Sequence, residues 1–468
     1  MMKMRRYAAA AIAIILILSA ALTGCGSNKS VNGGNGSVSL SSSDNSGGSE
    51  GSGGSGNSSS SGEQVSITFW DENSGPQRTP YYEELINRFE AANPDIKVDY
   101  VGLPASSAKQ KYDVAIASNE MPDIGGLNQF WISDFVAKGV LLDLEDYFSN
   151  WSEKDKIAPS AIDGSRSSAP DGKLYQIPNT SNYSTLWYRA DWFEDAGISV
   201  PQTFDEFFAT AGKLTDSAKG RYGYTIRGGA GSSKQLTEIL YAYSGITEYF
   251  DQDGKATIND PAHVEFLEKY VQLYGKNTPT SDVTNGYKEM VAVFDTGIAA
   301  MVQHNLGSFG EHTKAFGENA TEFKAAPLPK STQGYRVVTG GDNVGLAIFK
   351  SSKNPEAAWK FLTFLASEES QNYWNQNIGQ MPTRVDSLNS EWVKNSQHIL
   401  ALSEAIADPT TKVLIPPIYL PDYSSIQLNV LEPGFQSVLL GKESPEEFLD
   451  EWAQAMEAAL AEYQKSFK

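Results

Sequence analysis

The sequence predicts an α/β fold built from more than one globular unit. Segments with the pattern of strands alternate along the chain with segments of helical periodicity, which is typical of sheets covered by helices. The chain has 468 residues, 40% of them hydrophobic, whereas a single core rarely grows beyond about 250–300 residues. We therefore expect at least two α/β units, with parallel strands connected through helices.

The first part of the chain shows this alternation most clearly. Residues 65–70 are β-branched and alternate in polarity, so they predict a strand. A helix is expected at 80–92, where apolar residues recur at a spacing of three and four. The next expected elements are a strand at 96–101, a short buried strand at 121–124, a helix at 131–138 and an extended segment from 171 to 189.

Capping and turn signals organise the second part. Thr203 and Glu206 form a capping box that opens a helix reaching about residue 214. An Asp-Gly turn predicts a hairpin over 250–258, and a calcium loop is disfavoured there because its Gly and final Glu are out of register. Asn354 and Pro355 suit the cap and first turn of a helix. Further strands are expected at 297–302 and 335–349, and a last helix after the capping sequence 444–447.

Charge and composition exclude several classes of function. The chain has 37 Lys and Arg against 57 Asp and Glu, a formal net charge of −20, which argues against nucleic-acid binding. One Cys and four His, without a His-Glu-x-x-His spacing, argue against a disulfide framework, a multi-Cys zinc site and a zinc hydrolase. We expect no metal ion and no other cofactor.

Residues 1–24 have the features of an export signal. Three cationic residues precede an apolar run at 8–21, which is shorter than the roughly 20 residues that a membrane-spanning helix needs. The run ends in Leu22-Thr-Gly-Cys25, and Cys25 is the only cysteine. This ending resembles a bacterial lipobox, in which the signal is cut before the cysteine and the thiol is acylated, for example with palmitate. The alternative is an ordinary signal peptide with an incidental cysteine.

The segment after Cys25 has the composition of a flexible tether. Gly, Ser and Asn make up 31 of the 37 residues at 26–62, so this stretch has almost nothing to bury. We expect residues 25–64 to be a lipidated cysteine followed by a tether, holding a folded part that begins at residue 65. The expected location is the extracellular face of the cell membrane, with the lipid as the only membrane contact.

Several motifs in a fixed order resemble a known family. They are Met121-Pro-Asp-Ile124; Asp171-Gly-Lys-Leu-Tyr-Gln-Ile-Pro178 with Leu186-Trp-Tyr188 and Ala196-Gly-Ile-x-x-Pro201; Gly297-x-x-Ala300-Met301; and Gly340-Gly-Asp-Asn343 with Asn354-Pro-Glu-Ala-Ala-Trp-Lys-Phe-Leu362 and Gly379-Gln-Met-Pro382. Together they resemble family 1 of the extracellular solute-binding proteins, the sugar-capturing lipoproteins of bacterial ABC importers. The resemblance covers residues 65–468.

The resemblance implies a two-lobe, periplasmic-binding-protein-like (type II) fold that closes on its ligand about a hinge. Three crossing segments would lie near 178–184, 338–344 and 407–413. Lobe 1 would then comprise 65–178 plus 344–406, and lobe 2 would comprise 184–338 plus 413–468. The implied partners are a sugar or oligosaccharide and the ABC permease, and we expect a monomer without enzymatic activity.

The candidate ligand-binding residues are polar or aromatic groups at strand ends and in crossing segments. Such positions face the ligand in α/β proteins, and a sugar needs paired hydrogen-bonding groups together with aromatic platforms. The candidates are Trp70, Glu72, Asn73, Asn128, Trp131, Asn182, Tyr183, Arg227, His304, Asn305, Gly341, Asp342, Asn343, Tyr419 and Tyr423.

Each candidate has a competing structural role. Trp70 and Trp131 are also suited to core packing, Asn128 to a helix cap, and His304 to a buried structural position. Arg227 follows a strand and precedes a glycine-containing loop that we expect to be flexible. Trp374 favours packing over a platform role.

Other functions remain open from the residues alone. A tethered glycoside hydrolase would use two carboxylates about 5–9.5 Å apart, which spacing in sequence does not exclude. An adhesion or wall-bound scaffold protein would need no deep polar cleft. Among binding proteins, peptide, polyamine and metal ligands are alternatives, although the amide-rich candidates suit neutral hydroxyl groups better than cations.

Overall fold

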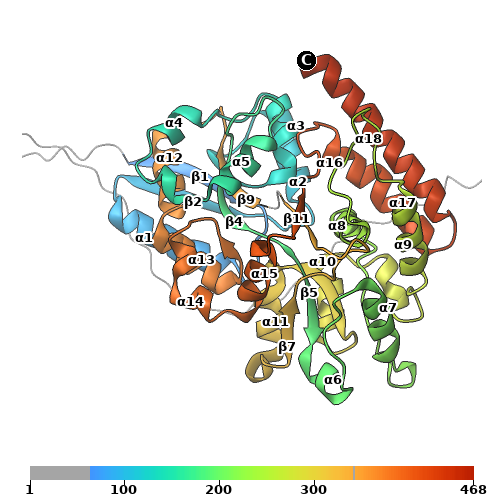
Figure 1. The fold of residues 1–468 in the computed structure, drawn as a ribbon. Helices are drawn as coiled ribbons and strands as arrows, with labels where there is room; N and C mark the ends of the chain where they lie inside the picture. Colours follow the sequence, from blue (N-terminus) through green and yellow to red (C-terminus); the bar gives the residue numbers. More distant parts are fainter. Residues whose placement is uncertain (1–63, 341–342, 468) are drawn as a thin grey trace, which may run out of the picture. The chain divides into compact units, whose positions relative to one another are not determined.

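The computed structural model describes residues 64–340 and 343–467. These described residues form one compact unit, which contains two separate sheets and a short two-stranded ladder (Figure 1). Within the described residues, no helix is both long and apolar enough to cross a membrane. The expected α/β fold is thus confirmed.

The first sheet has six strands in the order β10-β4-β9-β3-β1-β2. Its hydrophobic residues alternate between two faces: Phe69 and Ile348 belong to one buried cluster, and Leu127 and Ala347 to another. The strands are β1 (Val65–Asp71), β2 (Ile96–Gly102), β3 (Ile124–Asn128), β4 (Ile177–Ser181), β9 (Asn343–Ile348) and β10 (Met381–Pro382).

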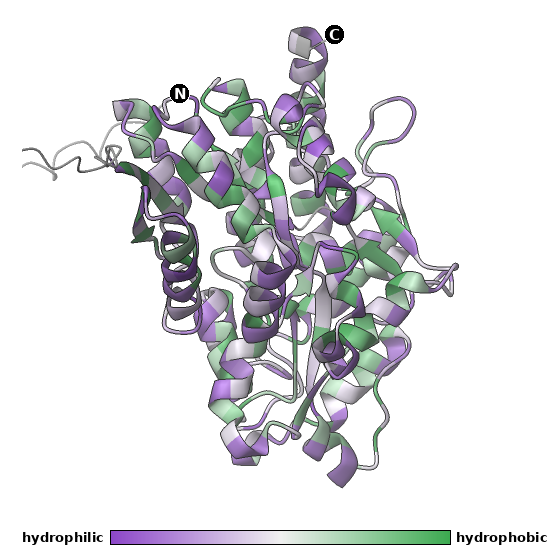
Figure 2. Ribbon diagram, turned by 90° about the vertical axis from the view of Figure 1, so that its left-hand side faces the viewer, coloured by the Kyte–Doolittle hydropathy of each residue, from purple (hydrophilic) through white to green (hydrophobic). Residues whose placement is uncertain are grey.

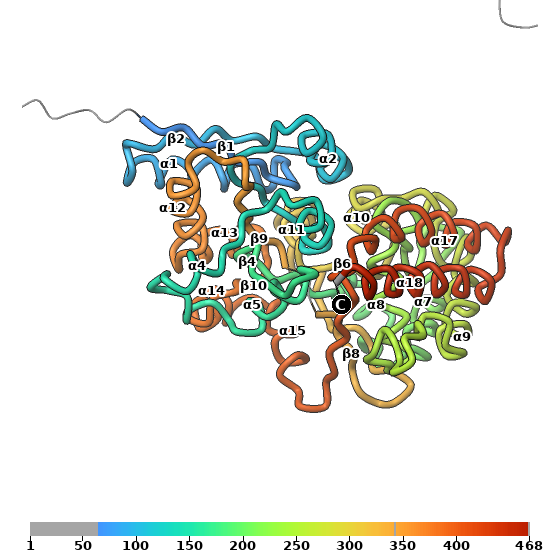
Figure 3. The backbone as a smooth tube through the Cα atoms, turned by 90° about the horizontal axis from the view of Figure 1, so that it is seen from above, coloured from blue at the N-terminus to red at the C-terminus, as the bar shows by residue number. Residues whose placement is uncertain are grey.

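Helices cover both faces of the first sheet, as Figures 1 and 3 show for α1, α12 and α13 on one side. The buried residues of these helices recur at helical spacing, for example Leu85, Ile86 and Phe89 of α1. The helices are α1 (Thr79–Ala92), α2 (Ala108–Ser118), α3 (Ile132–Ala137), α4 (Glu145–Ser149), α5 (Pro159–Ser167), α12 (Pro355–Leu365) and α13 (Glu368–Ile378).

The second sheet has three strands in the order β6-β5-β7. Leu186 and Trp187, neighbours on the central strand, point into different hydrophobic clusters, as the alternation of side chains in a strand requires. The strands are β5 (Ser184–Arg189), β6 (Met301–Asn305) and β7 (Phe323–Ala326).

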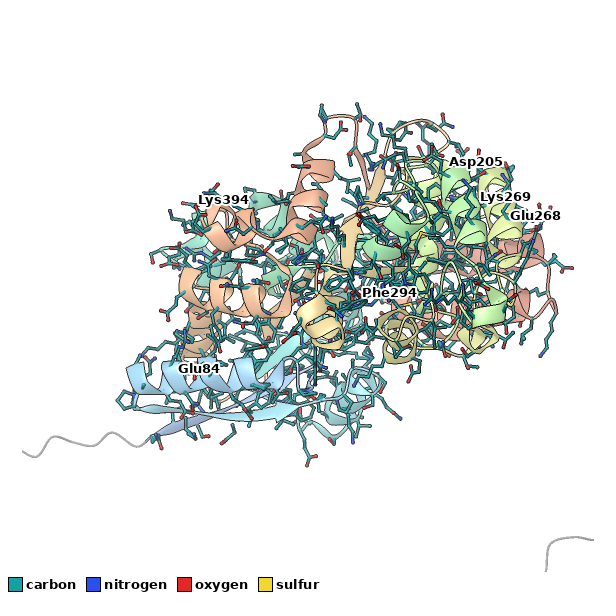
Figure 4. All side chains as sticks on the ribbon, turned by 90° about the horizontal axis from the view of Figure 1, so that it is seen from below. Glu84, Asp205, Glu268, Lys269, Phe294 and Lys394 are labelled. Carbon is teal, nitrogen blue, oxygen red and sulfur yellow. The ribbon has the colours of Figure 1, made fainter. Side chains whose placement is uncertain are left out.

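Most of the remaining helices surround the second sheet. Figure 2 shows hydrophobic residues on one side of many helices and hydrophilic residues on the other, and Figure 4 shows Phe294 inside while Asp205 and Glu268 lie on outer faces. The helices are α6 (Ala190–Asp195), α7 (Phe204–Lys213), α8 (Ser232–Ser244), α9 (Pro261–Val271), α10 (Tyr287–Asp295), α11 (Phe309–Phe316), α14 (Glu391–Lys394), α15 (Gln397–Ala407), α16 (Tyr423–Ile426), α17 (Glu432–Leu439) and α18 (Pro445–Phe467).

Short single-turn helices connect these elements. They are η1 (Gln129–Trp131), η2 (Lys154–Lys156), η3 (Ser217–Lys219), η4 (Thr280–Val283), η5 (Leu306–Ser308), η6 (Gly317–Asn319), η7 (Ser387–Asn389) and the wider turn η8 (Gln427–Leu431).

A third pairing joins chain segments that run beside the two sheets. Strand β8 (Val337–Thr339) pairs in parallel with β11 (Lys412–Leu414). Strand β4 ends in the first sheet at Ser181, and β5 begins in the second sheet at Ser184. Consecutive strands therefore enter different sheets within three residues.

Parallel pairing is less extensive than expected. Only β1 with β2 and β1 with β3 are parallel in the first sheet, whereas β9 is antiparallel to both β3 and β4. The second sheet is antiparallel throughout. Strand β9 enters the first sheet directly after β8 rather than after a covering helix, so no helical crossover sets its direction.

The capping signals are largely confirmed. Thr203 and Glu206 form the reciprocal bonds of a capping box at the start of α7, and Ser444 and Glu447 do the same before α18. Asn354 is the exception, because its side chain donates to the backbone oxygen of Ser66 rather than capping α12. A tertiary contact here replaces the local cap.

Two strand boundaries and the hairpin differ in detail from the expectation. Residues 121–123 lie before β3, which begins at Ile124, and residues 297–300 precede β6. The predicted hairpin at 250–258 is a turn with one bridge, Phe250 to Ala256, around Gly254 at φ +78°. The Asp251 carboxylate accepts the N–H groups of residues 253 and 255, so this carboxylate stabilises the turn itself.

We call the part of the fold around the first sheet the first half and the part around the second sheet the second half. The C-cap of α13 tests how closely these two halves pack. Gly379 has φ +69°, and a Cβ there would collide with the ring of Phe309 on α11. We expect Gly379→Ala to lower the free energy of unfolding by more than the roughly 1–2 kcal/mol of left-handed strain alone. Gly172→Ala is the matched control, because Gly172 has φ +71° with no atom near the added Cβ. Equal losses in urea unfolding would contradict this packing argument.

Candidate functional site

The chain crosses between the two sheets at Asn182 and Tyr183. The Asn182 side-chain oxygen accepts a hydrogen bond from the Gln380 amide at 2.6 Å, and the Thr180 hydroxyl donates to the other end of that amide at 3.1 Å. A Cβ at Gly307 would lie 2.9 Å from the same Gln380 nitrogen. Amide groups of the first half thus lie directly against the backbone of the second half.

Side chains beyond the ends of β3 also contact the second half. The rings of Phe130 and Tyr423 stack at 5.8 Å and 12°, and the Ser424 hydroxyl donates to the Phe130 carbonyl at 2.6 Å. The Ser133 hydroxyl donates to the Tyr419 carbonyl at 2.5 Å. We call the region around these contacts the junction, and we assign to it Glu72, Arg78 and Phe130 from the first half and Arg227, Lys234, Tyr287, His304 and Tyr423 from the second.

Charged groups gather where β1 ends at the junction. Asp71 is fully buried and accepts hydrogen bonds from the Tyr100 hydroxyl at 2.9 Å and from the Asn73 N–H at 3.1 Å. The Arg78 guanidinium lies 4.9 Å from the centre of the Trp374 ring. Glu72 is 6% exposed and Arg78 is 9% exposed. Among the described residues, Glu72 Oε2 and Arg78 Nε have no conventional hydrogen-bond partner. Glu72 Oε2 packs against β3, since a Cβ at Gly126 would lie 2.8 Å from it, and the Asp71 side chain interacts with the Glu72 carboxyl group.

Burial and the neighbouring Asp71 carboxylate raise the pKa of Glu72 to about 8, and the Arg78 charge only partly opposes this rise. A buried carboxyl group that loses water as hydrogen-bond partner favours its neutral form. At neutral pH, Glu72 is therefore mostly protonated and can donate a hydrogen bond as well as accept one.

An aromatic pair faces these groups from the second half. The rings of His304 and Tyr287 stack at 4.8 Å and 16°, and the Tyr287 hydroxyl donates to Glu311 at 2.6 Å. His304 is 8% exposed, and its Nδ1 has no partner among the described residues. Burial, followed by the charges of Arg227 and Lys234, holds the pKa of His304 well below its ordinary value. The imidazole is therefore neutral at neutral pH.

Tyr287 connects the two halves electrostatically. Burial raises its pKa, and the charges of Arg78 and Arg227 both oppose that rise. A guanidinium group from each half thus lies near the same hydroxyl. This placement shows that the loop after β1, the start of α10 and the loop before α8 converge.

The loop that carries Arg227 is closely packed against residues 282–285. The buried Asp282 carboxylate accepts the Ile226 N–H at 2.6 Å and the Thr225 hydroxyl at 3.0 Å. Added Cβ atoms at Gly228 and Gly229 would meet backbone atoms of residues 282–285 within 2.9 Å. The glycines are therefore needed for close backbone packing, and this packing holds Arg227 in place.

Arg227 is half-buried, with its Nε donating to the Ala230 carbonyl at 2.7 Å. Burial lowers its pKa to about 10, and the nearby Glu432 carboxylate opposes this. Lys234 lies in the first turn of α8, 3.8 Å from Glu238 and 6.0 Å from the Phe130 ring centre. Lys234 thus lies beside a carboxylate, and the Glu432 carboxylate acts on Arg227.

The predicted amide residues are largely engaged in local structure. The side-chain oxygen of Asn128 accepts the Phe130 N–H at 3.0 Å, and that of Asn305 accepts the Gly307 N–H at 3.0 Å, so both cap short helices. Asn343 accepts the Ser181 hydroxyl at 2.8 Å. These bonds occupy the side-chain oxygens and fix the orientation of the three amide groups.

The predicted aromatic residues fall into two groups. Trp70 and Trp131 are half-buried and lie on the same neighbour, with ring centres 5.3 and 6.1 Å from that of Tyr112. Tyr423 is buried at 3% exposure. Tyr183 and Tyr419 are half-buried, as is the predicted amide residue Asn73. Partial exposure leaves the two tryptophans able to contact a ligand.

Three predicted residues, Cys25, Gly341 and Asp342, lie outside the described residues. Sequence reasoning missed Arg78, Phe130, Lys234 and Tyr287. None of them directly follows a strand: Tyr287 opens α10, and Lys234 lies within α8. A cationic residue one turn into a helix is usually on a solvated face, so no local pattern distinguishes these positions.

Two cavities are lined by residues of the second half, and the second of them includes the junction residue Arg227. One of about 410 Å³ is lined by Tyr183, Glu238, Arg336 and Leu402 among others, and one of about 200 Å³ by Arg227, Gln235 and Gln303 among others. In the second cavity the side-chain oxygens of both glutamines lack partners among the described residues. Within 64–340 and 343–467, no three His, Cys, Asp or Glu side chains are placed to hold a metal ion.

Comparison with known proteins identifies close similarities. Residues 75–372 match the family model described as bacterial extracellular solute-binding protein. The mannitol-binding protein of Pseudomonas aeruginosa is 25% identical over 370 residues, covering 76% of this chain and 82% of the relative. This alignment runs through both sheets.

Solved structures share the fold over nearly their whole length. The GacH receptor of Streptomyces glaucescens, solved unliganded and with acarbose, superposes with a TM-score of 0.74 at 23% identity, covering 86% of this chain and 100% of that one. Maltose-bound MalE3 of T. maritima gives a TM-score of 0.72 at 25% identity, covering 84% and 99%. The fold is therefore that of the two-lobe binding proteins.

The raised pKa of Glu72 predicts a pH dependence of stability. Because folding raises this pKa from about 4.5 to about 8, the folded state holds the proton more tightly, and stability falls as pH rises between these values. We expect the loss from pH 5 to pH 8.5 to be smaller in Glu72→Gln, by on the order of 3 kcal/mol in urea unfolding. The exposed Glu83→Gln on α1 is the control. Parallel profiles for wild type and Glu72→Gln would refute the assignment.

Proposed function

Since this chain belongs to the bacterial extracellular solute-binding proteins, we propose that it captures a sugar or oligosaccharide at the junction and delivers it to an ABC permease. The mannitol, acarbose and maltose named for similar proteins support a polyhydroxylated ligand. The ligand would be held between the two lobes and released intact.

One observation carries this proposal. Glu72 Oε2, Arg78 Nε and His304 Nδ1 are buried polar atoms, and none has a hydrogen-bond partner among the described residues. A buried polar atom without a partner costs about 1–3 kcal/mol, so the gathering of three such atoms at one junction supports a molecule that supplies the missing bonds. They come from both halves of the protein.

The protonation states suit hydroxyl groups. A carboxyl with its pKa near 8 is mostly neutral at pH 7, and the His304 imidazole is neutral as well. Each can donate or accept, as a hydroxyl group requires. Trp70 and Trp131 offer half-buried rings for the apolar faces of a sugar.

Capture would couple to movement of the two lobes. A ligand favours the closed form only through contacts that exist there and not in the open form, which is why unpartnered atoms on both sides matter. We propose the lobe boundaries 65–178 plus 344–406 and 184–338 plus 413–468, with crossings at 178–184, 338–344 and 407–413. One adjustment follows from packing: Gln397 of α15 bonds both backbone groups of Ala325 in the second sheet, so we propose that α15 goes with lobe 2.

The remaining features of the proposal concern location and chemistry. We propose that Cys25 carries a lipid after removal of residues 1–24, and that 25–64 tether a monomer to the outer face of the membrane. We further propose that the protein is a binding protein without catalytic activity. A glycoside hydrolase is the alternative that the experiment below also tests.

Thermal unfolding of the full chain in mild detergent, with a panel of neutral mono- and oligosaccharides and polyols, tests ligand capture. A ligand at about 100 times its Kd should stabilise the protein by about 2.7 kcal/mol, and product analysis should recover it unchanged. Cleaved products would favour the hydrolase. No shift with any compound would contradict sugar binding.

Variants from each half locate the site. We expect His304→Ala and Glu72→Ala each to weaken binding of the sugar found in the panel by about tenfold or more, because each removes a buried hydrogen bond to the ligand. The matched control is Glu83→Ala on the exposed side of α1. Titration calorimetry that gave wild-type affinity for both site variants would place the ligand elsewhere.

A further inference from the structure

The start of α8 carries a set of groups suited to binding an anion. Backbone N–H groups at the beginning of a helix of this length are unpaired and carry partial positive charge. Gly231 at this position has φ +81° and no side-chain cap of its own. A Cβ at Gly231 would collide with the Arg227 guanidinium, so this cation lies directly against the helix start.

A carboxylate of the protein occupies this set. Glu432 Oε1 accepts the Gly231 N–H at 2.6 Å and the Ser233 hydroxyl at 3.3 Å. Glu432 is the first residue of α17, about 200 positions further along the chain. Its charge acts on Arg227, and the charge of Arg227 acts on it in turn. The donor set and the carboxylate therefore form one compact, internally neutralised group.

This group lies at the junction. Arg227 acts electrostatically on Tyr287, and so does Arg78 from the first half. Arg227 also lines the cavity of about 200 Å³. A ligand held between the lobes near Tyr287 would thus approach Arg227 from one side while Glu432 holds the other.

We propose that Glu432 makes the site selective against anionic ligands, because its carboxylate occupies the donors that a phosphate or carboxylate group of a ligand would otherwise bind. This inference rests on the proposed function and narrows the ligand class to uncharged sugars and polyols. An anionic ligand would have to displace Glu432 or lie beside it, and like charges at short range in a partly buried site repel strongly.

The other cations at the junction are balanced in the same way. Lys234 lies 3.8 Å from Glu238, and Arg78 lies beside the Asp71 carboxylate. Arg78, Arg227 and Lys234 therefore each have a carboxylate nearby that balances their positive charge. Hydroxyl groups can share such paired donors and acceptors without disturbing the charge balance.

Inorganic phosphate is the probe, and its use requires no knowledge of the sugar. We expect the wild-type full chain to show no saturable phosphate binding by titration calorimetry at low ionic strength, with chloride at matched ionic strength as reference. In Glu432→Gln, the amide oxygen can still accept the Gly231 N–H, but the negative charge is gone. We expect its phosphate affinity to rise by about tenfold or more, which corresponds to about 1.4 kcal/mol.

Two further variants make the result specific. Glu446→Gln removes the same charge from an exposed position on α18 and should leave phosphate binding at the wild-type level. Arg227→Gln added to Glu432→Gln should abolish the gain, which places the phosphate at this group of donors.

Saturable phosphate binding by the wild type would overturn the inference even if every variant failed to fold. So would a Glu432→Gln protein that loses thermal stability without gaining phosphate affinity, since Glu432 would then be only a structural cap. The sugar panel fails independently: a chain that binds no sugar yet gains phosphate affinity on Glu432→Gln would contradict the sugar proposal while supporting the charge role of Glu432.

Discussion

The structure depends on the passage of the chain between two sheets within a few residues. Strand β4 ends in the first sheet at Ser181 and β5 begins in the second at Ser184, so Asn182 and Tyr183 must lie between two hydrophobic cores. Polar groups in such a place need partners, and the Asn182–Gln380–Thr180 chain of hydrogen bonds supplies them. The same constraint brings the loops after β1 and β3 against α8, α10 and α16, and thereby creates the junction.

The junction combines rigid supports with a few unsatisfied atoms. Arg227 is held by a loop that Asp282 fixes through two short bonds, and Arg78 is packed on Trp374. Against this background, Glu72, Arg78 and His304 each keep one buried atom without a hydrogen-bond partner in the part of the chain that the structure describes. Preorganised groups of this kind lose little conformational entropy on binding, which favours a ligand that meets them from both lobes.

Charge pairing determines which ligands are suited to these supports. Burial shifts Glu72 and His304 toward their neutral forms, and Glu432 neutralises the donors at the start of α8. Although the junction contains several cations, its hydrogen-bonding groups therefore suit an uncharged ligand better than an anion. The physical reason is that a low-dielectric site stabilises a charge only when an opposite charge is not already bound there.

The sequence alone predicted part of the elements and two capping boxes, because hydrophobic periodicity and capping boxes such as Thr203 with Glu206 are local interactions. It also predicted several polar residues at strand ends, including Glu72 and His304, since a side chain that follows a buried strand has a defined location. It did not reveal Arg78, Lys234, Tyr287 or Glu432. These residues lie on helices or in loops with no local signal, and their role arises only when segments as distant as Gly231 and Glu432 are brought to 2.6 Å. Strand direction in both sheets, and the use of Asn128 and Asn305 as caps, were likewise decided by tertiary structure, because backbone groups left unpaired by the fold take the nearest available partner.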